Sequence, residues 1–381
     1  MFKRFVKIWV SIVVICVIML FVCSVIIDPI GILDMPKIRG INNYKVEQNL
    51  YVYVYKPYQY LKANADVVFV GSSRVHAGLK ANLLDKQKKV YNFGCSGMTL
   101  PHMEEILKFI YNTNKPKEIY IGLDFFQFAQ GHFRSVKSGF SIERLENLLN
   151  KSSSDIFVQS MKENFMLSKS LWATVKMSRK NKDAGEININ GWNSKEGSVN
   201  NCNKKAFYGA INQYKKAYDK WIFEPESIKC LKRIVNEAQR QGVKLVFFMN
   251  PINIDLFALI NAHGLYSDFE MIKKLIVSVV GKLYDFNFVN DYTKNRDEFY
   301  FDAAHYNAKF GEAIKKAIAL NEDKSMLHIL TEENKEEKLN KQHKYNELWM
   351  IENAVYLSYL RKRVKCVGMI EQGELQEFIG F

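Results

Sequence analysis

The chain has 381 residues, of which 48% are hydrophobic, and its 54 basic residues against 40 acidic ones give a net charge of +14 at pH 7. This length and apolar content can bury a sizeable core, which excludes disorder over most of the chain and predicts one large or two ordinary domains. The charge favours anionic surroundings such as phospholipid head groups, anionic cell-wall polymers or nucleic acid. Nucleic acid is the weakest of these, and we expect no nucleic-acid partner, because the sequence has no zinc-finger spacing, no RNA-binding aromatic signature and no dense basic stripe.

The N-terminal segment predicts a membrane anchor over residues 1–28. Three cations, Lys3, Arg4 and Lys7, precede an uncharged run over 8–27, which is about the twenty residues that an α-helix needs to cross a bilayer. The cations before the run and the Asp-Pro after it predict a cytoplasmic N-terminus, with the rest of the chain outside. A cleaved signal peptide is the alternative, but its apolar region is shorter and ends in small residues.

Beyond the anchor, five short apolar runs predict buried parallel strands, because they are apolar on both faces and rich in β-branched or aromatic residues. Helical patterns lie between them, from Pro101 to about Thr113, from Pro225 to a stop at Gly242, and after Asn307. The alternation predicts an open α/β sheet with helices on both faces. The runs are DVVFVG, KVYNFG, EIYIGLDFF, VKLVFFMNP and KLYDFNFV.

The alternation is interrupted twice. The insertion over 131–204 contains two helical pieces, SIERLENLLN and DIFVQSMKENFMLSKSLWATV, and then a polar loop; we interpret it as a lid or a docking surface. After residue 320 the chain becomes highly charged and then helical, beside RKRVK. A peripheral helix is favoured there over a contact with a membrane or a partner. The predicted organisation is therefore an anchor, a juxtamembrane linker over 29–62, an α/β domain over 63–320 and a charged helical extension over 321–381.

Cysteine usage indicates neither a metal nor a cofactor, and we expect none. Cys16 and Cys23 lie in the apolar run, and the others form no Cys-x-x-Cys pair and no metal-like spacing with histidine. The sequence leaves open whether one disulfide forms among the four cysteines beyond the apolar run, which are Cys95, Cys202, Cys230 and Cys366.

Polar residues follow several predicted strands, at the carboxyl ends where open α/β sheets bind their ligands. The first strand runs into Gly-Ser-Ser-Arg at 71–74. Near the end of the sheet pattern, FYFDAAHYN places Asp302 and His305 three residues apart. A serine nucleophile needs a base to take its proton and a carboxylate to hold that base in its reactive tautomer. The order of these residues predicts a serine site, without distinguishing Ser72 from Ser73.

The motifs resemble the four blocks of the SGNH (GDSL-like) hydrolases and acyltransferases. The first block of that family carries the nucleophile, which the resemblance assigns to Ser73. VYNFGCSGMT resembles the second block, whose glycine N–H enters the oxyanion hole; the glycine here is Gly97. Asp302 and His305 resemble the Asp-x-x-His block, so the resemblance makes them the other members of a Ser-His-Asp triad.

The third block departs from the family's pattern. Where the hydrolases have Gly-x-Asn-Asp, IGLDFF has Asp124 in place of the asparagine that donates to the oxyanion. A carboxylate donates only when protonated, so we expect Asp124 to orient a neighbour or to bind a substrate hydroxyl. The expected oxyanion and substrate-binding set also includes Arg74 and Asn250. Arg74 either binds an anionic group of the acyl donor or pairs with a nearby acid. The resemblance covers roughly 60–130 and 225–320 and implies a flavodoxin-like three-layer α/β/α fold with a parallel sheet.

Several other polar and aromatic residues have simpler interpretations than a role in the site. His305 is preferred to His76 as the base, because His76 has no carboxylate near it in the sequence. His102 and His132 lie near the ends of predicted strands, where lining the cleft is one alternative, but surface positions are favoured. The alternating tyrosines of YVYVYKPYQY, at 51–60, are expected in a strand or a membrane-interface belt rather than in a glycan-stacking face.

The anchor, the Gly-Ser-Ser-Arg opening and the aspartate of the third block are most similar to the membrane-anchored branch of the family, related to the lipoteichoic-acid D-alanylation protein DltD and the alginate O-acetylation proteins AlgJ and AlgX. This resemblance implies a serine O-acyltransferase at the outer, periplasmic or extracellular face of the bacterial cytoplasmic (inner) membrane. Its expected partners are a multi-pass membrane-bound O-acyltransferase and a cell-envelope glycan or teichoic-acid-like polymer. An SGNH-type acyl esterase and a catalytically silent partner of the membrane acyltransferase stay open as alternatives.

Overall fold

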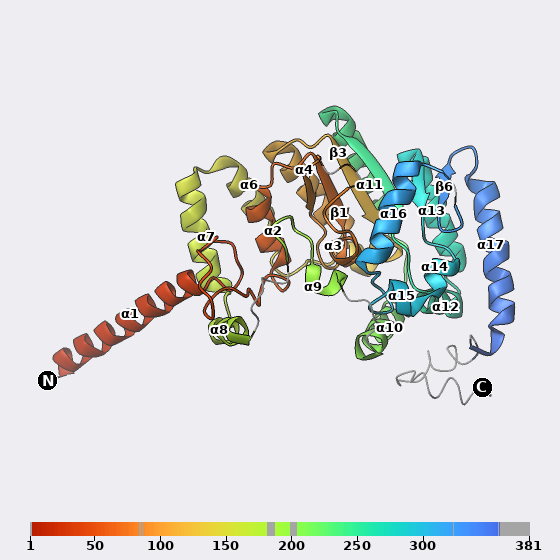
Figure 1. The fold of residues 1–381 in the computed structure, drawn as a ribbon. Coiled ribbons are helices and arrows are strands. Elements are labelled where there is room, and N and C mark those ends of the chain that lie inside the picture. The colour runs from red at the N-terminus through yellow and green to blue at the C-terminus, as the bar shows by residue number, and fades with distance from the viewer. Residues whose placement is uncertain are drawn as a thin grey trace. The chain divides into compact units, whose positions relative to one another are not determined.

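The computed structural model describes residues 2–83, 85, 87–180, 187–198, 204–322, 324–356 and 358 (Figure 1). The contacts divide these residues into two compact units. The anchor unit contains the described residues of 1–62 and 138–189, and the sheet unit contains those of 63–137 and 190–381. Most of the insertion therefore folds together with the N-terminal segment.

The sheet unit is built on a six-stranded sheet in the order β2-β1-β3-β4-β5-β6. All five apolar runs form strands that pair in parallel, which confirms the prediction of an α/β fold. The order of these five, 2-1-3-4-5, is the order of flavodoxin-like doubly wound sheets. The strands are β1 (Val67–Gly71), β2 (Val90–Asn92), β3 (Glu118–Leu123), β4 (Lys244–Met249), β5 (Lys282–Asp285) and β6 (His328–Thr331).

Strand β6 corrects the prediction that residues after 320 form only a charged helical extension. It runs antiparallel to β5, with Leu330 opposite Leu283. A four-residue strand beside a charged stretch gives too short a pattern to be seen in the sequence. The charged stretch that follows forms α17 (Lys335–Glu352), which packs Leu339 and Trp349 inward. The basic RKRVK sequence lies outside the described residues.

Helices cover both faces of the sheet. Right-handed crossovers place α4, α11 and α13 on one face, where α11 contacts both α4 and α13. Helices α3 and α16 pack together and share a core cluster with the opposite face, which contains Phe69, Phe248 and Phe310. The three helical patterns of the sheet region are confirmed as α4, α11 and α16. The helices of this unit are α3 (Ser73–Gly78), α4 (Leu100–Thr113), the 3₁₀-helix η1 (Phe125–Phe128), α5 (Gln130–Phe133), α9 (Ser194–Gly197), α10 (Lys204–Tyr218), α11 (Glu226–Gln241), α12 (Ile254–Ala262), α13 (Tyr266–Val280), α14 (Asp291–Lys294), α15 (Arg296–Phe299), α16 (Ala308–Leu320) and α17.

The anchor unit is helical. Among the described residues, α1 (Phe2–Ile27) is the one helix long and apolar enough to cross a membrane, with a mean hydropathy of 3.3 in its most apolar window. This agrees with single-pass membrane anchoring. The unit also contains α2 (Val52–Tyr60), α6 (Ile142–Asn150), α7 (Ser153–Leu167) and α8 (Leu171–Lys180). The second helical piece of the insertion is thus two helices.

The tyrosine-rich stretch at 51–60 forms helix α2, so the expected strand or interface belt is wrong. Every residue of α2 is buried, including Lys56 and Pro57. The alternating tyrosines favour a strand locally, but a segment that is buried on all sides follows tertiary packing rather than its own propensity.

The cysteines that the structure describes form no disulfide with one another. The buried thiols of Cys95 and Cys230 form no disulfide with any described cysteine. Cys202 and Cys366 lie outside the described residues.

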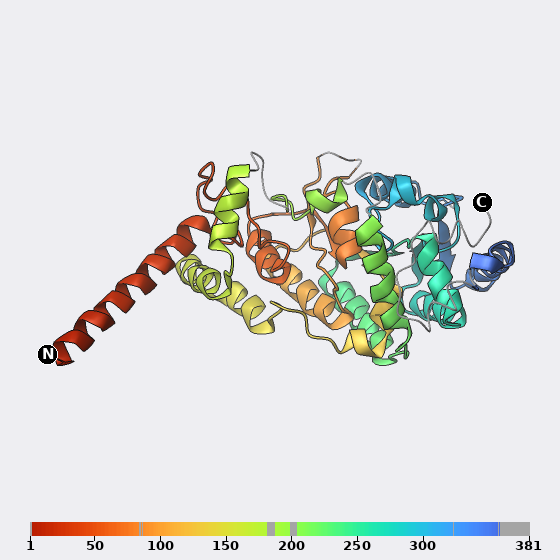
Figure 2. The ribbon, with the colours of Figure 1, turned by 90° about the horizontal axis from the view of Figure 1, so that it is seen from below.

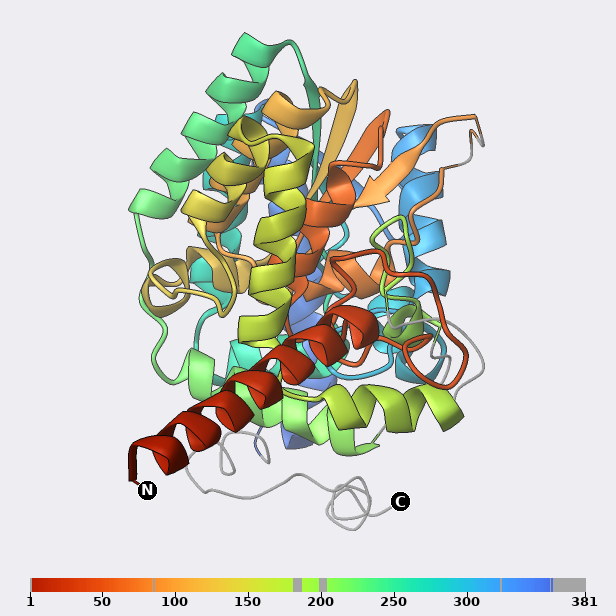
Figure 3. The same ribbon diagram turned by 90° about the vertical axis from the view of Figure 1, so that its left-hand side faces the viewer.

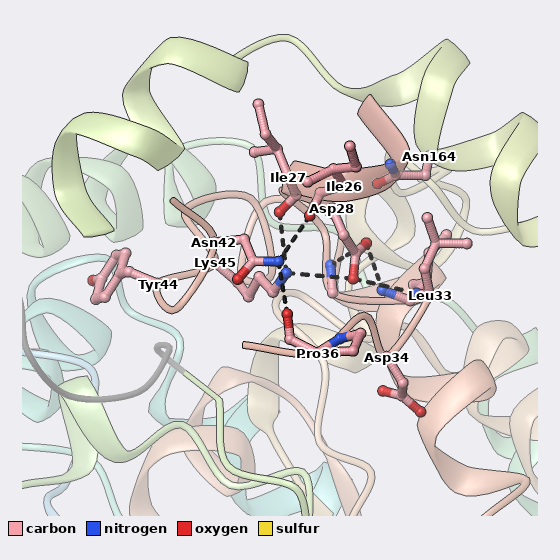
Figure 4. Close-up of polar contacts among 12 residues, drawn as sticks. Ile26, Ile27, Asp28, Leu33, Asp34, Pro36, Asn42, Tyr44, Lys45 and Asn164 are labelled. Carbon is pink, nitrogen blue, oxygen red and sulfur yellow. Dashed lines mark hydrogen bonds and ion pairs between the residues drawn. The ribbon is translucent and has the colours of Figure 1, made fainter. Parts of the chain in front are cut away.

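The chain leaves α1 through a buried polar cluster, shown in Figure 4. The last carbonyls of a helix lack intrahelical partners, and here Asn42 Nδ2 donates to Ile26 O at 2.7 Å and Lys45 Nζ to Ile27 O at 3.1 Å. The fully buried Asp28 accepts from the N–H groups of Gly31 and two following residues and pairs with Lys45 at 3.4 Å. Burial raises the pKa of Asp28 to about 6 against the opposing effect of Lys45.

Candidate active site

Ser73 lies at the turn from strand β1 into helix α3. The strand ends at Gly71 and the helix begins at Ser73. A Cβ on Gly71 would lie 2.5 Å from a methyl carbon of Val75 and 2.9 Å from the carbonyl oxygen of Gly122. Only glycine fits such a close approach, so the chain turns sharply and presents Ser73 at the carboxyl end of the sheet.

Asp302 and His305 lie on a tight turn before α16. The turn is closed by a bridge between Tyr300 and Tyr306. Asp302 Oδ1 accepts from the backbone N–H groups of Ala304 at 2.7 Å and His305 at 2.8 Å. The aspartate therefore fixes the backbone that carries the histidine as well as facing its ring.

The three predicted triad residues meet in one hydrogen-bonded chain. His305 Nε2 lies 2.7 Å from Ser73 Oγ, and His305 Nδ1 lies 2.8 Å from Asp302 Oδ2. With the proton on Nδ1, the imidazole donates to the carboxylate and accepts from the serine hydroxyl, which is the arrangement that nucleophilic serines use.

The ion pair shifts the pKa values of Asp302 and His305 in opposite directions. Burial opposes the imidazolium, but the Asp302 carboxylate outweighs it and raises the pKa of His305. Burial also opposes ionisation of Asp302, while His305 and the two backbone N–H groups lower the pKa of this carboxyl. At neutral pH the pair thus combines an ionised aspartate with a base stronger than free histidine.

The neighbouring candidates Ser72 and His76 occupy other positions. Ser72 is fully buried as the N-cap of α3, where its Oγ accepts from Arg74 N at 3.2 Å. His76 is fully buried within α3. The structure thus brings Ser73 and His305 to the site, and leaves Ser72 and His76 in the scaffold.

Arg74 and Asp124 form a buried ion pair behind the triad. The guanidinium also donates to Ala304 O at 2.7 Å, on the turn that carries His305, and to Tyr214 Oη at 2.9 Å, on α10. Of the two alternatives for Arg74, a nearby acid is what it contacts here. Asp124 orients a neighbour, as expected for a carboxylate at this place.

Asn250 also lies behind the site. It is fully buried, its Nδ2 donates to Leu123 O at 3.3 Å, and its Oδ1 accepts from the Tyr306 hydroxyl at 2.9 Å. It thereby connects the ends of β3 and β4 to the histidine turn. None of Arg74, Asp124 and Asn250 borders the pocket described next.

Ser73 and His305 open into a pocket of about 760 Å³. One wall is α10, whose small residues, such as Gly209 and Ala210, leave room beside the nucleophile. The lining combines aromatic rings with cations. It includes Ser96, Gly97, Phe126, His132, Lys137, Tyr214, Lys216, Lys220, Trp221 and Phe301.

Lys137 lines the pocket although no sequence motif points to it. A Cβ on Gly97 would lie 3.3 Å from Lys137 Nζ, so the ammonium group rests directly over the predicted oxyanion glycine. Burial lowers the pKa of Lys137. The ammonium group is thus a half-buried cation in the pocket that Ser73 also lines, and no described carboxylate forms an ion pair with it.

The two other histidines near strand ends are not at the surface, in contrast to the expectation. His132 lines the pocket, and His102 is buried in α4. Burial, and then the charge of Lys137, lower the pKa of His102 to about 4 and of His132 to about 3. Both imidazoles are therefore neutral at pH 7, and Lys137 supplies the positive charge at this edge of the pocket.

Comparison of the chain with protein-family models and with curated proteins gives no match. The geometry of the site is therefore what carries the functional argument.

Proposed function

We propose that the protein is a membrane-anchored serine O-acyltransferase that acts outside the cytoplasmic membrane on a cell-surface or cell-wall polymer. The observation that carries the proposal is the chain of hydrogen bonds from Ser73 through His305 to Asp302, three residues that line a pocket of about 760 Å³. A serine, a histidine and a buried carboxylate in this arrangement generate a nucleophile at neutral pH.

The proposed reaction has two half-reactions. Ser73 Oγ attacks the acyl carbonyl of a thioester or ester donor while its proton passes to His305 Nε2. When the tetrahedral intermediate collapses, the carbonyl–leaving group bond breaks and His305 returns the proton to the leaving group. An acceptor hydroxyl then gives its proton to His305 and attacks the acyl-enzyme, and Ser73 leaves with that proton.

The negative charge of each intermediate needs hydrogen-bond donors. The N–H of Ser73, at the first position of α3, has no acceptor within its helix, and Gly97 lies across the same pocket. The strand side chain that donates in the hydrolases is replaced by Asp124, which serves Arg74. We assign the role of this missing oxyanion donor to Lys137, whose ammonium group lies over Gly97.

The shape and lining of the pocket favour transfer over simple hydrolysis. A cavity of about 760 Å³ is larger than a short acyl group requires and falls in the range that encloses a drug-sized ligand. Its aromatic rings suit the faces of sugar residues, and Lys216 and Lys220 suit an acidic acceptor. A sugar polymer in this pocket would bring its hydroxyl to the acyl-enzyme in place of water.

The remaining parts of the proposal follow from the resemblance and agree with the fold. The strand order, the serine after β1 and the Asp-x-x-His turn before α16 support an SGNH-type domain. Cations in the first two turns of α1 and none directly after it support a cytoplasmic N-terminus. A multi-pass membrane-bound O-acyltransferase is the proposed source of acyl groups.

The test is covalent labelling of the full chain in detergent with a fluorophosphonate probe. We expect the wild type to be labelled and S73A to be unlabelled. S72A is the matched control, because it removes the adjacent cap hydroxyl at a cost of about 1 kcal/mol and leaves the nucleophile. Absence of labelling in a folded wild type would favour the catalytically silent partner.

Transfer is then separated from hydrolysis by the decay of the acyl-enzyme. The enzyme is acylated with p-nitrophenyl acetate, and its deacylation is followed with and without an acidic polysaccharide or a teichoic-acid polymer. We expect the polymer to accelerate deacylation and to acquire the acyl group. Equal rates with every acceptor would instead identify an esterase.

A further inference from the structure

The C-terminal end of α1 is covered by the helices of the insertion. The ring of Phe21 packs edge-on against Phe165 of α7, with centroids 5.4 Å apart. Asn164 Nδ2 donates to the carbonyl of Ser24 at 2.7 Å and to its hydroxyl at 3.0 Å. Helices α7 and α8 both meet this end of α1 in two perpendicular views (Figure 2, Figure 3).

The length of α1 decides how deep this contact lies. At 1.5 Å per residue, the helix rises about 20 Å from Ile8 to Phe21, against a hydrocarbon layer of about 30 Å. If Lys7 snorkels and the layer begins near Arg4, the rise to Phe21 is about 26 Å and is still too short. A bilayer that surrounds α1 therefore reaches past Phe21, to the depth of Phe165.

The surface of α7 and α8 near this contact combines exposed apolar and aromatic side chains with lysines, as membrane-interface surfaces do. Met166 and Trp172 are each 70% exposed. Lys169 lies between these two residues in the sequence, and Lys176 lies one helical turn after Trp172. Both lysines are exposed. Tryptophan is enriched at head-group level, and lysines near the surface are attracted to anionic lipids.

We propose that the turn between α7 and α8 is a second membrane contact of the anchor unit. Met166 and Trp172 enter the lipid at head-group level, and Lys169 and Lys176 contact lipid phosphates. The occupant of this surface is the phospholipid bilayer itself, because the surface is continuous with a helix that the bilayer surrounds. The inference rests on α1 spanning the membrane, which is part of the proposed function, but not on any catalytic activity.

The experiment measures quenching of tryptophan fluorescence by brominated lipid. The full chain is reconstituted into vesicles of phosphatidylcholine and phosphatidylglycerol, with or without bromine on acyl carbons 6 and 7. Variants keep one of the five tryptophans and carry phenylalanine at the others. We expect the chain that keeps Trp172 to lose at least half as much intensity as the one that keeps Trp9, which lies within α1.

Trp192 is the negative control. Its indole is buried and donates to Ala77 O at 2.7 Å in the sheet unit, so lipid cannot reach it. Because multiple substitutions can unfold the chain, the same quantity is measured a second way, as the difference between the wild type and the single variant W172F in each lipid.

Each outcome has one meaning. Quenching of Trp172 in both measurements supports the proposal. Quenching of Trp9 without quenching of Trp172 overturns it and leaves this surface for a protein partner in the membrane. A Trp9 that is not quenched shows that α1 is not in the bilayer, so that the anchor fails rather than the second contact alone.

Discussion

Arg74 and Asp124 follow two neighbouring strands and form an ion pair from which water is excluded, with the guanidinium 2% exposed and the carboxylate fully buried. The aspartate that departs from the hydrolase pattern is therefore the counter-ion of an arginine that departs from it too. Through its bond to Ala304 O, the arginine holds the turn that carries the catalytic histidine of the proposed triad. Both residues act as positioning residues.

The substitution D124N, which introduces the asparagine of the hydrolase pattern, is expected to destabilise the folded protein. It leaves the Arg74 charge buried without its counter-ion, which costs about 3–5 kcal/mol, so the thermal unfolding temperature falls by several degrees. Differential scanning calorimetry measures the loss. D291N, at a carboxylate whose side chain is 87% exposed, is the matched control and should change nothing. An unchanged unfolding temperature together with faster probe labelling would mean that Asp124 is not a structural counter-ion.

The pH dependence of acylation follows from the raised pKa of His305. The base must be neutral, so the rate falls as the pH drops through this raised pKa, which lies above the ordinary 6.5. In D302N the ring loses the carboxylate that raises its pKa, so the acidic limb moves to lower pH while kcat falls by about 10⁴. Stopped-flow acylation by p-nitrophenyl acetate between pH 5 and 9 measures both effects. A limb at the same pH in both proteins would assign it to another group.

Lys137 is expected to stabilise the oxyanion. Removal of one such donor typically costs about 10²–10³ in kcat, so K137M should lose this factor with KM almost unchanged, even with an uncharged ester. K216M is the matched control, because Lys216 lines the same pocket from α10 and is expected to affect only acidic acceptors.

The wild-type rate should also fall at alkaline pH. Burial lowers the pKa of Lys137, so its ammonium form is lost earlier than that of a free lysine. K137R should move this alkaline limb upward. Equal rates for K137M and the wild type with the uncharged ester would remove Lys137 from the mechanism while leaving the triad intact.

Asp28 is expected to make the anchor unit less stable as the pH rises. Its carboxyl titrates near 3.8 when unfolded and near 6 when folded, so the folded state holds more protons between these values and stability falls as the pH rises through them. The difference in pKa corresponds to about 3 kcal/mol. Thermal unfolding in detergent from pH 4 to 6.5 should show this fall in the wild type and not in D28N. D34N, at a half-exposed side chain, should behave like the wild type.

The sheet and the triad could be predicted because their signals are local. Five strands are continuous apolar runs, and each predicted triad residue follows or precedes one of the sheet's regular elements. The rule that parallel strands present their carboxyl ends at one edge then brings Ser73 together with His305. The Gly-Ser-Ser-Arg motif alone could not distinguish Ser72 from Ser73 as the nucleophile. The two serines differ in the folded protein, where the Ser72 hydroxyl caps α3 and the Ser73 hydroxyl does not.

Other parts of the site depend on contacts that no local pattern encodes. Lys137 lies on a loop outside every motif, and its role rests on its approach to Gly97, forty residues earlier in the chain. Tyr214 reaches Arg74 from a helix beyond the insertion. Strand β6 and helix α2 were missed for the same reason, since partner strands and burial on all sides decide their conformation.

The wide separation of the triad along the chain has a consequence for biosynthesis. Ser73 and His305 are 232 residues apart, and Arg74 draws its partners from positions 50, 140 and 230 residues away. A chain still emerging from the ribosome therefore exposes its serine long before it has a base, and carries an arginine whose charge has no burial site to occupy. If the proposed triad is catalytic, Ser73 therefore becomes a reactive nucleophile only once synthesis has passed His305, 232 residues later.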